Sequence, residues 1–416
     1  MPRINVARLR PGIFISLVEY GWMGHPFLLN RFCLTSDKQI QAIRAMGITE
    51  IEWDPSRSSA EPLPAAVPGS PRAAEPDFAS SALASMQDEK RARIERVRQQ
   101  REGMARRERL FEQNTIAAGE VFRSLLARPQ DAHRQASALV GGLVENLLAA
   151  DDMVVHLVGQ KSREGGLAFH ALNVTALSLM LGKSLRLSEE EMRHLGLGAL
   201  LHDVGKQDIP SRVLRSSKRT GPEEDFYRAH VGYGIKAVSG FRDLPVPVKN
   251  IIACHHEFTD GTGFPNRLAG ERIPRLARIA AIANRYDNLC NPFDLREARA
   301  PAEALRQMFR SEAARYDAQM LQLFIKTLGV YPPGTFVALS NGGVGMVVET
   351  NPAALLHPLV MLHDPDIPRS EALLIDLRDA DLTVESALSP AKLPLELVEY
   401  LAPRGRLDYF VESSKT

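Results

Sequence analysis

Apolar side chains recur at helical spacing from about residue 136 to residue 330, in stretches broken by glycine, proline and asparagine. The same region shows no convincing alternation of apolar and polar residues, which would be typical of a half-buried strand. Helices with one apolar stripe bury that stripe against another element, and a run of them packs as a bundle. We therefore expect a mainly α protein with an all-α domain over residues 136–330.

The two ends of the chain carry other patterns. Residues 1–54 alternate apolar and polar positions at 12–18, then show a helical stretch at 36–46 and a strand at 49–53, which predicts a small α+β domain. Residues 331–416 begin with apolar stretches between turn signals and predict a small antiparallel β extension. Its predicted strands are 336–339, 344–349 and 359–362, and a helical tail near 394–401 closes the chain.

Two segments join the N-terminal domain to the helical domain. Residues 55–87 are rich in proline, alanine and serine with few large apolar side chains, so they are predicted to form a disordered linker. Residues 88–135 are rich in Arg, Glu and Gln and predict a long charged helix. Arg101 and Glu108 interrupt its apolar heptad, which favours a solvated helix, although a coiled coil stays open.

Net charge, apolar runs and cysteine content indicate which partners and which cellular compartment to expect. The formal net charge is only +1, so nothing global draws the chain to DNA or to an anionic membrane. The N-terminus lacks the apolar run of a signal peptide, and no segment approaches the ~20 uninterrupted apolar residues that span a bilayer. The three cysteines have no CxxC spacing and predict free thiols in a reducing compartment. We therefore expect a cytoplasmic protein that does not insert into membranes.

One apolar helical stretch, residues 199–204, contains the adjacent pair His202 and Asp203. Two ionisable groups among apolar side chains are costly to bury unless a metal ion or a partner compensates them. A carboxylate can bridge two cations while an imidazole completes the coordination. Taken alone, however, such a pair more often makes a hydrogen bond at a helix end.

Four more histidines lie where separate helices can bring them to this pair. His170 shares a helical stripe with apolar residues, His230 precedes glycines that allow close helix approach, and His255 and His256 end an apolar stretch. Each one alone would most often be a satisfied core histidine. Together they predict a metal centre, next to a glycine-rich loop at 260–265 whose backbone can approach a ligand.

In this order the motifs resemble the HD-GYP family, which comprises cyclic di-GMP phosphodiesterases of the HD metal-hydrolase superfamily. The resemblance covers residues 136–330 and rests on His170 with Asn173 and Val174, His202-Asp203-x-Gly205-Lys206, His230, His255-His256-Glu257 and Asp260-Gly261-x-Gly263-Phe264-Pro265. Residues 1–54, with Leu9-Arg10-Pro11-Gly12 near their start, resemble a small domain of unknown function that often precedes HD-GYP domains. The resemblance therefore implies an HD-type all-α fold for the central domain.

The resemblance also implies roles for individual residues. It implies two divalent transition-metal ions, iron or manganese, held by His170, His202, Asp203, His230, His255, His256 and Asn284. Asp203 and Lys206 are the implied catalytic residues, because Asp203 would bridge the metals and Lys206 would hold phosphate. The implied substrate is cyclic di-GMP, opened to pGpG or on to GMP. Its implied contacts are Lys206, Asp260, Gly261, Gly263, Phe264, Pro265 and Arg296.

Several positions depart from the family pattern. Asn284 stands where the family has an aspartate ligand, and a neutral amide compensates less metal charge than a carboxylate. Phe264 replaces the tyrosine of the GYP motif and so lacks its hydroxyl. The arginine that often follows is missing at 291–293, and Arg296 is the candidate to replace it. Gly166, one turn before His170, offers no carboxylate for a third metal ion, which favours two ions.

Alternative functions stay open at this level. The retained ligands and Lys206 favour a phosphodiesterase, whereas Asn284 and the missing arginine favour a catalytically degenerate protein that is a cyclic di-GMP receptor or a protein-interaction module. A hydrolase of another nucleotide is a third reading. We expect the N-terminal domain and the charged helix to serve dimerisation or signal input, so a homodimer and signalling-protein partners are further expectations.

Overall fold

A computed structural model describes residues 1–21, 24–27, 30–64, 76–150, 153–158, 166–216, 218–365, 367–380, 382–402 and 406–413. The chain divides into two compact units. The first consists of Met1–Glu102 with Asp364–Pro368, and the second of Gly103–His363 with Arg369–Thr416. The long helix α2 (Pro76–Ser124) belongs in part to each unit.

A four-stranded antiparallel sheet and one short helix contribute to the hydrophobic core of the first unit. The sheet has the order β1-β4-β2-β3, with β1 (Arg3–Asn5), β2 (Phe14–Ser16), β3 (Arg31–Cys33) and β4 (Glu50–Trp53). Helix α1 (Asp37–Ala45) begins with a capping box between Ser36 and Gln39, and it buries Ile40 and Ile43 in the core of this unit. The predicted small α+β domain is confirmed.

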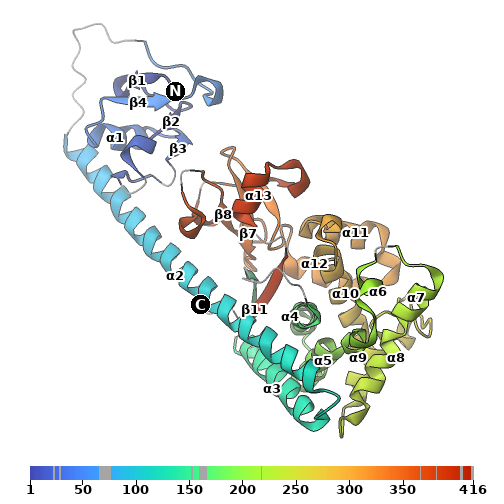
Figure 1. Ribbon diagram of the computed structural model, residues 1–416. Coiled ribbons are helices and arrows are strands. Elements are labelled where there is room, and N and C mark those ends of the chain that lie inside the picture. The colour runs from blue at the N-terminus through green and yellow to red at the C-terminus, as the bar shows by residue number, and fades with distance from the viewer. Residues whose placement is uncertain are drawn as a thin grey trace. The chain divides into compact units, whose positions relative to one another are not determined.

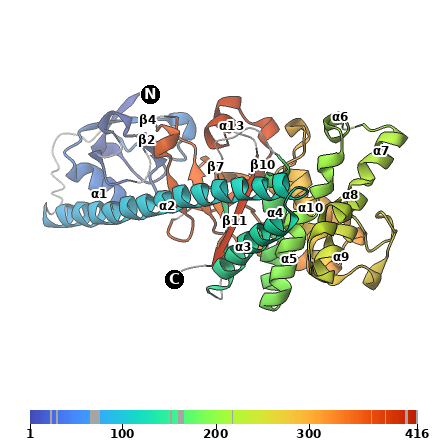
Figure 2. The same cartoon turned by 60° about the horizontal axis from the view of Figure 1, so that its bottom comes forward.

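Helices dominate the second unit (Figure 1). They are α3 (Pro129–Leu148), α4 (Leu167–Ser184), α5 (Glu189–Leu201), α6 (Ser211–Arg215), α7 (Gly221–Arg228), α8 (His230–Ala237), α9 (Val246–Cys254), α10 (Arg275–Cys290), α11 (Pro301–Ser311), α12 (Ala318–Leu328) and α13 (Leu395–Leu401). Helix α3 runs beside the C-terminal part of α2 (Figures 1 and 2), and Val121, Phe122, Ala132 and Val140 of these helices join one buried core. The mainly α fold is thus confirmed.

An antiparallel sheet accompanies these helices. Its strands are β5 (Met153–Val158), β6 (Phe336–Leu339), β7 (Val344–Glu349), β8 (Leu359–Leu362), β9 (Leu374–Asp376), β10 (Val384–Leu388) and β11 (Asp408–Ser413). The order is β10-β6-β7-β5-β11, and β8 pairs with β7 and with β9. The three predicted strands have the bounds of β6, β7 and β8. Strand β11 pairs with β5 along its whole length, so the end of the chain returns to the helical domain.

The structure differs from the sequence prediction at three places. Helix α2 begins at Pro76 and not at residue 88, because proline suits the first helical turn and the alanines that follow favour helix. Of the predicted 55–87 linker, residues 65–75 lie outside the described residues. The charged helix ends at Ser124, and a separate helix begins at Pro129. Strand β5 interrupts the region expected to be entirely helical, because a six-residue apolar run carries too little periodicity to be assigned alone.

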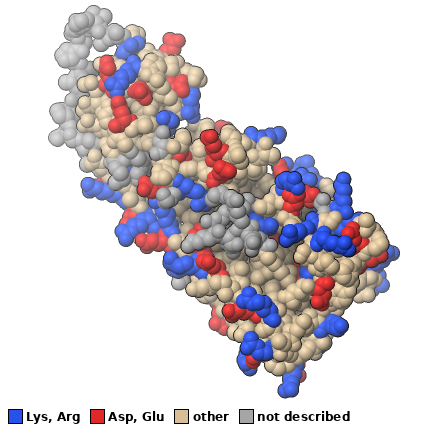
Figure 3. Space-filling model, in the orientation of Figure 1, with Lys and Arg blue, Asp and Glu red and all other residues tan. Residues whose placement is uncertain are grey.

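The surface and the cysteines agree with the composition. Basic and acidic side chains are interspersed on the face shown in Figure 3, in keeping with the small net charge. Cys33, Cys254 and Cys290 are free, and the last two are buried. Among the described residues, no helix combines the length and the apolar character that crossing a membrane requires.

Candidate metal centre

His202 and Asp203 lie where α5 ends. The helix begins with a capping box between Ser188 and Glu191, and its apolar side chains carry it into the core. Asp203 leaves helical geometry (φ −104°, ψ 7°), and its side chain is 1% exposed. Gly205 follows, where a Cβ atom would lie 2.0 Å from the carbonyl oxygen of His230. Only glycine therefore lets this turn approach the start of α8 so closely.

Backbone carbonyl groups orient three of the imidazoles. The Nδ1 atom lies 2.6 Å from a carbonyl oxygen in His202, 2.6 Å in His230 and 2.9 Å in His255, each time three residues earlier in the chain. A carbonyl oxygen only accepts hydrogen bonds, so each Nδ1 carries the proton. Each Nε2 is left with a lone pair that can bind a metal ion.

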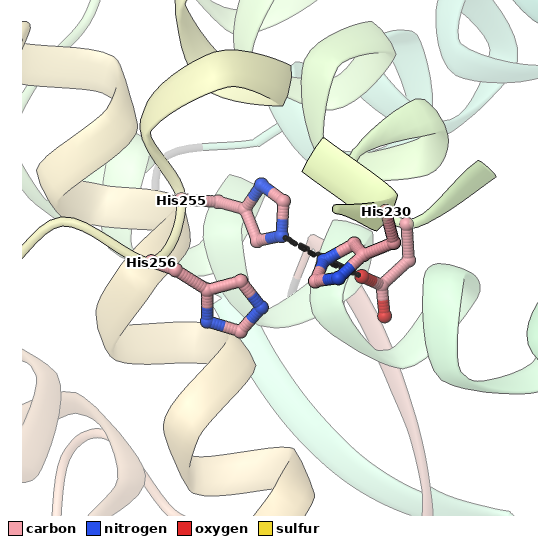
Figure 4. Close-up of side chains that lie close together, drawn as sticks. His230, His255 and His256 are labelled. Atoms are coloured by element: carbon pink, nitrogen blue, oxygen red, sulfur yellow. Dashed lines mark hydrogen bonds and ion pairs between the residues drawn. The ribbon is translucent and has the colours of Figure 1, made fainter. Parts of the chain in front are cut away.

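Asp203 lies between two sets of imidazoles. The three-histidine group contains His230, His255 and His256, and the two-histidine group contains His170 and His202. Asp203 Oδ1 is 3.3 Å from His230 Nε2 and 3.5 Å from His255 Nε2. Asp203 Oδ2 is 3.3 Å from Nε2 of both His170 and His202. Figure 4 shows the rings of the three-histidine group facing a common space. By the distances above, each carboxylate oxygen of Asp203 lies next to a different group.

The cluster fits a pair of divalent cations. Asp203 Oδ1 and His256 Nε2 are buried without a hydrogen-bond partner among the described residues. The Nε2 atoms of His230 and His255 are 3.3 Å apart, and the same distance separates those of His170 and His202. Lone pairs at this distance repel unless a proton or a cation lies between them. Imidazole nitrogens and a carboxylate are ligands that first-row transition metals prefer.

Burial sets the protonation of this cluster. It lowers the pKa of His255 to about 4, and it also lowers the pKa of His202, His230 and His256. Neutral imidazole is the form that binds a metal ion. Burial alone would raise the pKa of Asp203, but the charge of Lys206 and the hydrogen bond from His170 hold it well below its usual value. The carboxylate therefore remains ionised beside the four imidazoles whose pKa is lowered.

His170 is oriented by a carboxylate in place of a backbone carbonyl. Its Nδ1 lies 2.6 Å from Oδ2 of Asp287 on α10. The other oxygen of Asp287 accepts hydrogen bonds from Asn173 and Asn291, both at 2.8 Å. Burial would lower the pKa of His170, but the hydrogen bonds to Asp203 and Asp287 raise it to about 9. Such a carboxylate fixes the tautomer of a metal-binding histidine.

A cavity of about 490 Å³ opens onto His170 of the two-histidine group and onto Asp203. Its lining includes His170, Asp203, Lys206 and Asp287. The Lys206 ammonium contacts Asp203 Oδ2 and lies 5.5 Å from the centre of the Tyr227 ring. Lys206 therefore contacts the cluster and also borders the space in which a ligand can bind.

Similar proteins are known for almost the whole chain. Residues 2–136 match a domain of unknown function (DUF3391), and residues 143–320 match an HD domain. Over 372 residues, the chain is 30% identical to the Pseudomonas aeruginosa protein named cyclic di-GMP phosphodiesterase PA4108. This match covers 86% of this chain and 84% of that protein. The chain belongs to the HD-GYP family.

Two further relatives match in part. The Xanthomonas campestris pv. campestris protein named cyclic di-GMP phosphodiesterase response regulator RpfG is 32% identical over 166 residues, which are 39% of this chain and 44% of that protein. The solved structure of Bd1817, an HDG"Y"P protein from Bdellovibrio bacteriovorus, is 16% identical with a TM-score of 0.45, over 78% of this chain and 97% of that chain. The HD phosphodiesterase family binds divalent metal ions, and the histidine–aspartate cluster is where this chain can hold them.

The GYP-type loop of this HD-GYP chain supports the three-histidine group. At Gly263, a Cβ atom would lie 2.5 Å from the carbonyl oxygen of His256 and 2.4 Å from the backbone nitrogen of Phe258. The ring of Phe264 stacks on His256, with centres 4.4 Å apart and planes at 21°. The backbone N–H of Phe264 donates to the His256 carbonyl oxygen at 3.1 Å. The loop therefore fixes the position of His256.

The residues of this loop were expected to contact substrate, yet none lines the described cavity. The loop residues concerned are Asp260, Gly261, Gly263, Phe264 and Pro265. Asp260 accepts hydrogen bonds from the N–H and the hydroxyl of Thr262, at 2.9 and 2.6 Å. The Glu257 carboxylate accepts from the backbone of Asn266 at 2.6 Å and of Leu268 at 2.9 Å. The Asp260 and Glu257 side chains thus stabilise the loop itself, and contact of this loop with substrate stays a prediction.

Two other expected site residues also lie apart from the cavity lining. The Arg296 side chain is 89% exposed and pairs with Asp294 at 2.5 Å, so it projects into solvent and is not among the lining residues. Asn284 is buried in α10, where its amide oxygen accepts a hydrogen bond from Asn288 at 2.6 Å. The sequence assigned no function to Asp287 or to Arg406, although both line the cavity.

Proposed function

We propose that this HD-GYP chain is a cyclic di-GMP phosphodiesterase that uses two divalent transition-metal ions, iron or manganese, and yields pGpG or GMP. The observation that carries the proposal is the position of Asp203, whose two carboxylate oxygens face separate imidazole groups. A shared carboxylate of this kind suits a two-metal phosphodiester cleavage. The names of the Pseudomonas and Xanthomonas relatives support the choice of substrate.

The residues of the cluster would have separate roles in binding metal ions and phosphate. The three-histidine group would hold one ion, and the two-histidine group, with the amide oxygen of Asn284, would hold the other. Two such ions supply Lewis acidity, which lowers the pKa of water and offsets charge on phosphate. Lys206 lines the cavity, so its ammonium can donate to a nonbridging phosphate oxygen. Burial would lower the pKa of Lys206, but its attraction to Asp203 raises it, so the side chain stays charged.

A degenerate receptor of cyclic di-GMP is the second candidate. The observation that favours it is Asn284, whose amide oxygen already accepts a hydrogen bond from Asn288. A neutral oxygen that is engaged in this way binds a cation more weakly than a carboxylate does. A receptor would bind cyclic di-GMP without turnover, and a pure interaction module would not bind it. Calorimetric titration therefore separates these two forms.

The test is turnover by protein that is purified without oxygen and loaded with iron(II) or manganese(II). We expect linear pGpG to accumulate from cyclic di-GMP, measured by chromatography, together with about two metal ions per chain. His255→Asn removes a ligand and should abolish turnover. His357→Asn is the matched control, since this half-buried histidine lies in a turn of the β extension. A flat time course with both metals contradicts the proposal.

For the rest of the chain, we propose a cytoplasmic protein whose N-terminal domain and charged helix serve dimerisation or signal input. The boundary of the helix matters for the test, because Ala118, Val121 and Phe122 of α2 belong to the core of the second unit. Removal of residues 1–102 leaves that core covered, whereas removal of residues 1–135 would expose it. An unchanged oligomeric state after removal of residues 1–102, measured by light scattering, contradicts a role in dimerisation.

A further inference from the structure

The wall of the metal-site cavity includes a residue from the far end of the chain. Arg406 comes just before β11 and lines the same cavity as His170, Asp203 and Lys206. Because β11 pairs with β5 over its whole length, this segment is tied to the sheet. The residue therefore has a fixed support next to the cluster.

Leu407, the next residue, is held by two asparagine side chains. Its carbonyl oxygen accepts hydrogen bonds from Asn173 at 2.9 Å and from Asn291 at 2.8 Å, and its N–H donates to Asn291 Oδ1 at 2.8 Å. Asn173 Oδ1 also accepts from the backbone N–H of Tyr409 at 3.0 Å. The same two amides donate to Asp287, which accepts from His170. One network thus fixes both the C-terminal segment and a ligand of the cluster.

Within the part of the chain that the structure describes, the Arg406 guanidinium makes few hydrogen bonds. Its Nη1 reaches the carbonyl oxygen of Pro292 only at 3.5 Å, and its buried Nε has no hydrogen-bond partner among the described residues. Asp287 and Asp408 attract the charge, but both oxygens of Asp287 already accept hydrogen bonds from other side chains. Burial nevertheless lowers the pKa of Arg406, so the surroundings do not fully compensate its charge.

Two other cations of the cavity wall make polar contacts, and a third, Arg215, lies 5.2 Å from the centre of the Phe293 ring. The Lys206 ammonium contacts Asp203. Arg219 donates to the carbonyl oxygen of Val213 at 2.9 Å and lies 3.9 Å from the centre of the Tyr227 ring. An anion that enters the cavity would therefore find at Arg406 a guanidinium that makes only one long hydrogen bond to the described residues.

We propose that Arg406 binds a phosphate group of the dinucleotide, so that the segment before β11 supplies a substrate-binding residue to the metal centre. The inference rests on the proposed function, because a cyclic dinucleotide carries two phosphodiester groups and one of them lies away from the site of cleavage. The planar fork of a guanidinium matches two oxygens of one phosphate, and such charge-assisted bonds are strong. Arg406 binds and orients substrate and takes no part in bond cleavage.

The test compares Arg406→Met with the unaltered chain, both loaded with metal. We expect the KM for cyclic di-GMP to rise about tenfold to a hundredfold, because a charge-assisted hydrogen bond is lost. We expect kcat to stay within about threefold, since the metal ligands and Lys206 are untouched. Metal content should not change. Bis(p-nitrophenyl) phosphate has a single phosphodiester group, so its KM should change less than about twofold.

Two further variants control for structure and charge. Arg406→Lys keeps the charge but not the fork, so it should recover part of the lost affinity. Arg378→Met is the matched control, because this arginine is 54% exposed, pairs with Asp376 at 2.6 Å and lies outside the cavity lining. It should leave every constant unchanged. Loss of metal from Arg406→Met, or an equal loss with both substrates, would show a structural role and overturn the inference.

The outcomes separate this inference from the proposed function. An unchanged KM in Arg406→Met, with turnover intact, overturns the inference and leaves the phosphodiesterase standing. If the unaltered chain shows no turnover, calorimetry with cyclic di-GMP decides. A dissociation constant at least about tenfold weaker in Arg406→Met then supports the binding role without the enzyme. Equal binding by both chains, or no binding by either, overturns the inference.

Discussion

The two imidazole groups that share Asp203 are built by different means. In the three-histidine group, backbone carbonyls orient His230 and His255, and the tight turn at Gly263 holds His256. In the two-histidine group, His170 depends on a carboxylate of α10 that is itself held by side chains of α4 and α10. The first group therefore rests on local backbone geometry. In the second group a backbone carbonyl likewise orients His202, but His170 rests on contacts between segments far apart in sequence.

Because of this difference, substitutions far from the cluster can alter the position of His170 in the two-histidine group. The asparagines that bind Asp287 also bind the backbone of Leu407, so His170 and the C-terminal segment belong to one network. Asn284, the departure from the family pattern, lies on α10 one turn from Asp287. The cavity that holds Arg406 opens onto this group as well. We therefore expect changes elsewhere in the chain to alter metal affinity and its regulation more in the two-histidine group than in the three-histidine group.

The largest effect is expected from the residue that the two groups share. In Asp203→Asn an amide replaces the carboxylate that both groups share, so neither group would keep a negatively charged ligand. We expect metal content to fall from two ions to below one, and turnover to fall by about a thousandfold or more. Mass spectrometry of bound metal and product chromatography measure both. Asp131→Asn, at an exposed helix position, is the control. Retention of one full ion would show that the three-histidine group does not need the carboxylate.

A smaller and one-sided effect is expected from Asp287→Asn. If the new amide oxygen keeps the bonds from Asn173 and Asn291, its NH₂ faces His170 and forces Nδ1 to accept. The proton then moves to Nε2, the atom that should bind metal. Second-layer changes of this kind cost about tenfold to a hundredfold in metal affinity. Manganese titration should show one weakened site and one unchanged site. Equal weakening of both sites would remove the distinction between the groups.

Restoring a carboxylate on α10 should strengthen the weaker group. We expect Asn284→Asp to tighten metal binding there and to raise turnover about tenfold at limiting metal, because an anionic oxygen compensates more charge. Asn250→Asp, on α9, is the matched control. A chain that turns over only after Asn284→Asp supports the receptor as the natural function. No change in metal affinity would mean that position 284 does not bind the metal.

Much of the three-histidine group could be predicted from sequence. Each of these residues lies within a short motif: His230, the adjacent His255 and His256, and Gly263. Local backbone geometry then orients the rings where α8 packs against α9. The sequence also located His202 and Asp203, whose helix end is a local feature.

The rest of the site depends on contacts that short motifs do not encode. The spacing of α10 places Asp287 on an inward face but does not name His170 as its partner. Arg406 lies beyond the last predicted element, and only the pairing of β11 with β5 brings its segment back to the cavity. The sequence instead suggested Arg296 as the phosphate-binding arginine, because it is close in sequence to the motif at 291–293, but its side chain is exposed. Strand pairing at long range is set by the tertiary fold and not by local pattern.

The smallest effect on either group is expected from an ion pair that supports α10. Glu312 is buried, and it accepts hydrogen bonds from Arg285 at 2.9 and 2.6 Å and from Gln307 at 2.8 Å. Burial would raise the pKa of Glu312, but these donors lower it to about 2. A depressed pKa in the folded state adds stability above the unfolded pKa of about 4.3, and this stability is lost as the pH falls towards 2.

Glu312→Gln should therefore lower the free energy of unfolding by about 2 kcal/mol at pH 7, less than for a fully buried pair because Arg285 is 32% exposed. The deficit should shrink at pH 3, where the unaltered chain loses part of the same contribution. Urea unfolding of metal-free protein at both pH values measures this difference. Metal content and turnover at pH 7 should stay within about twofold, because the pair contacts neither group. A selective loss of one metal ion would instead show that the two-histidine group depends on the position of α10 as well as on its side chains.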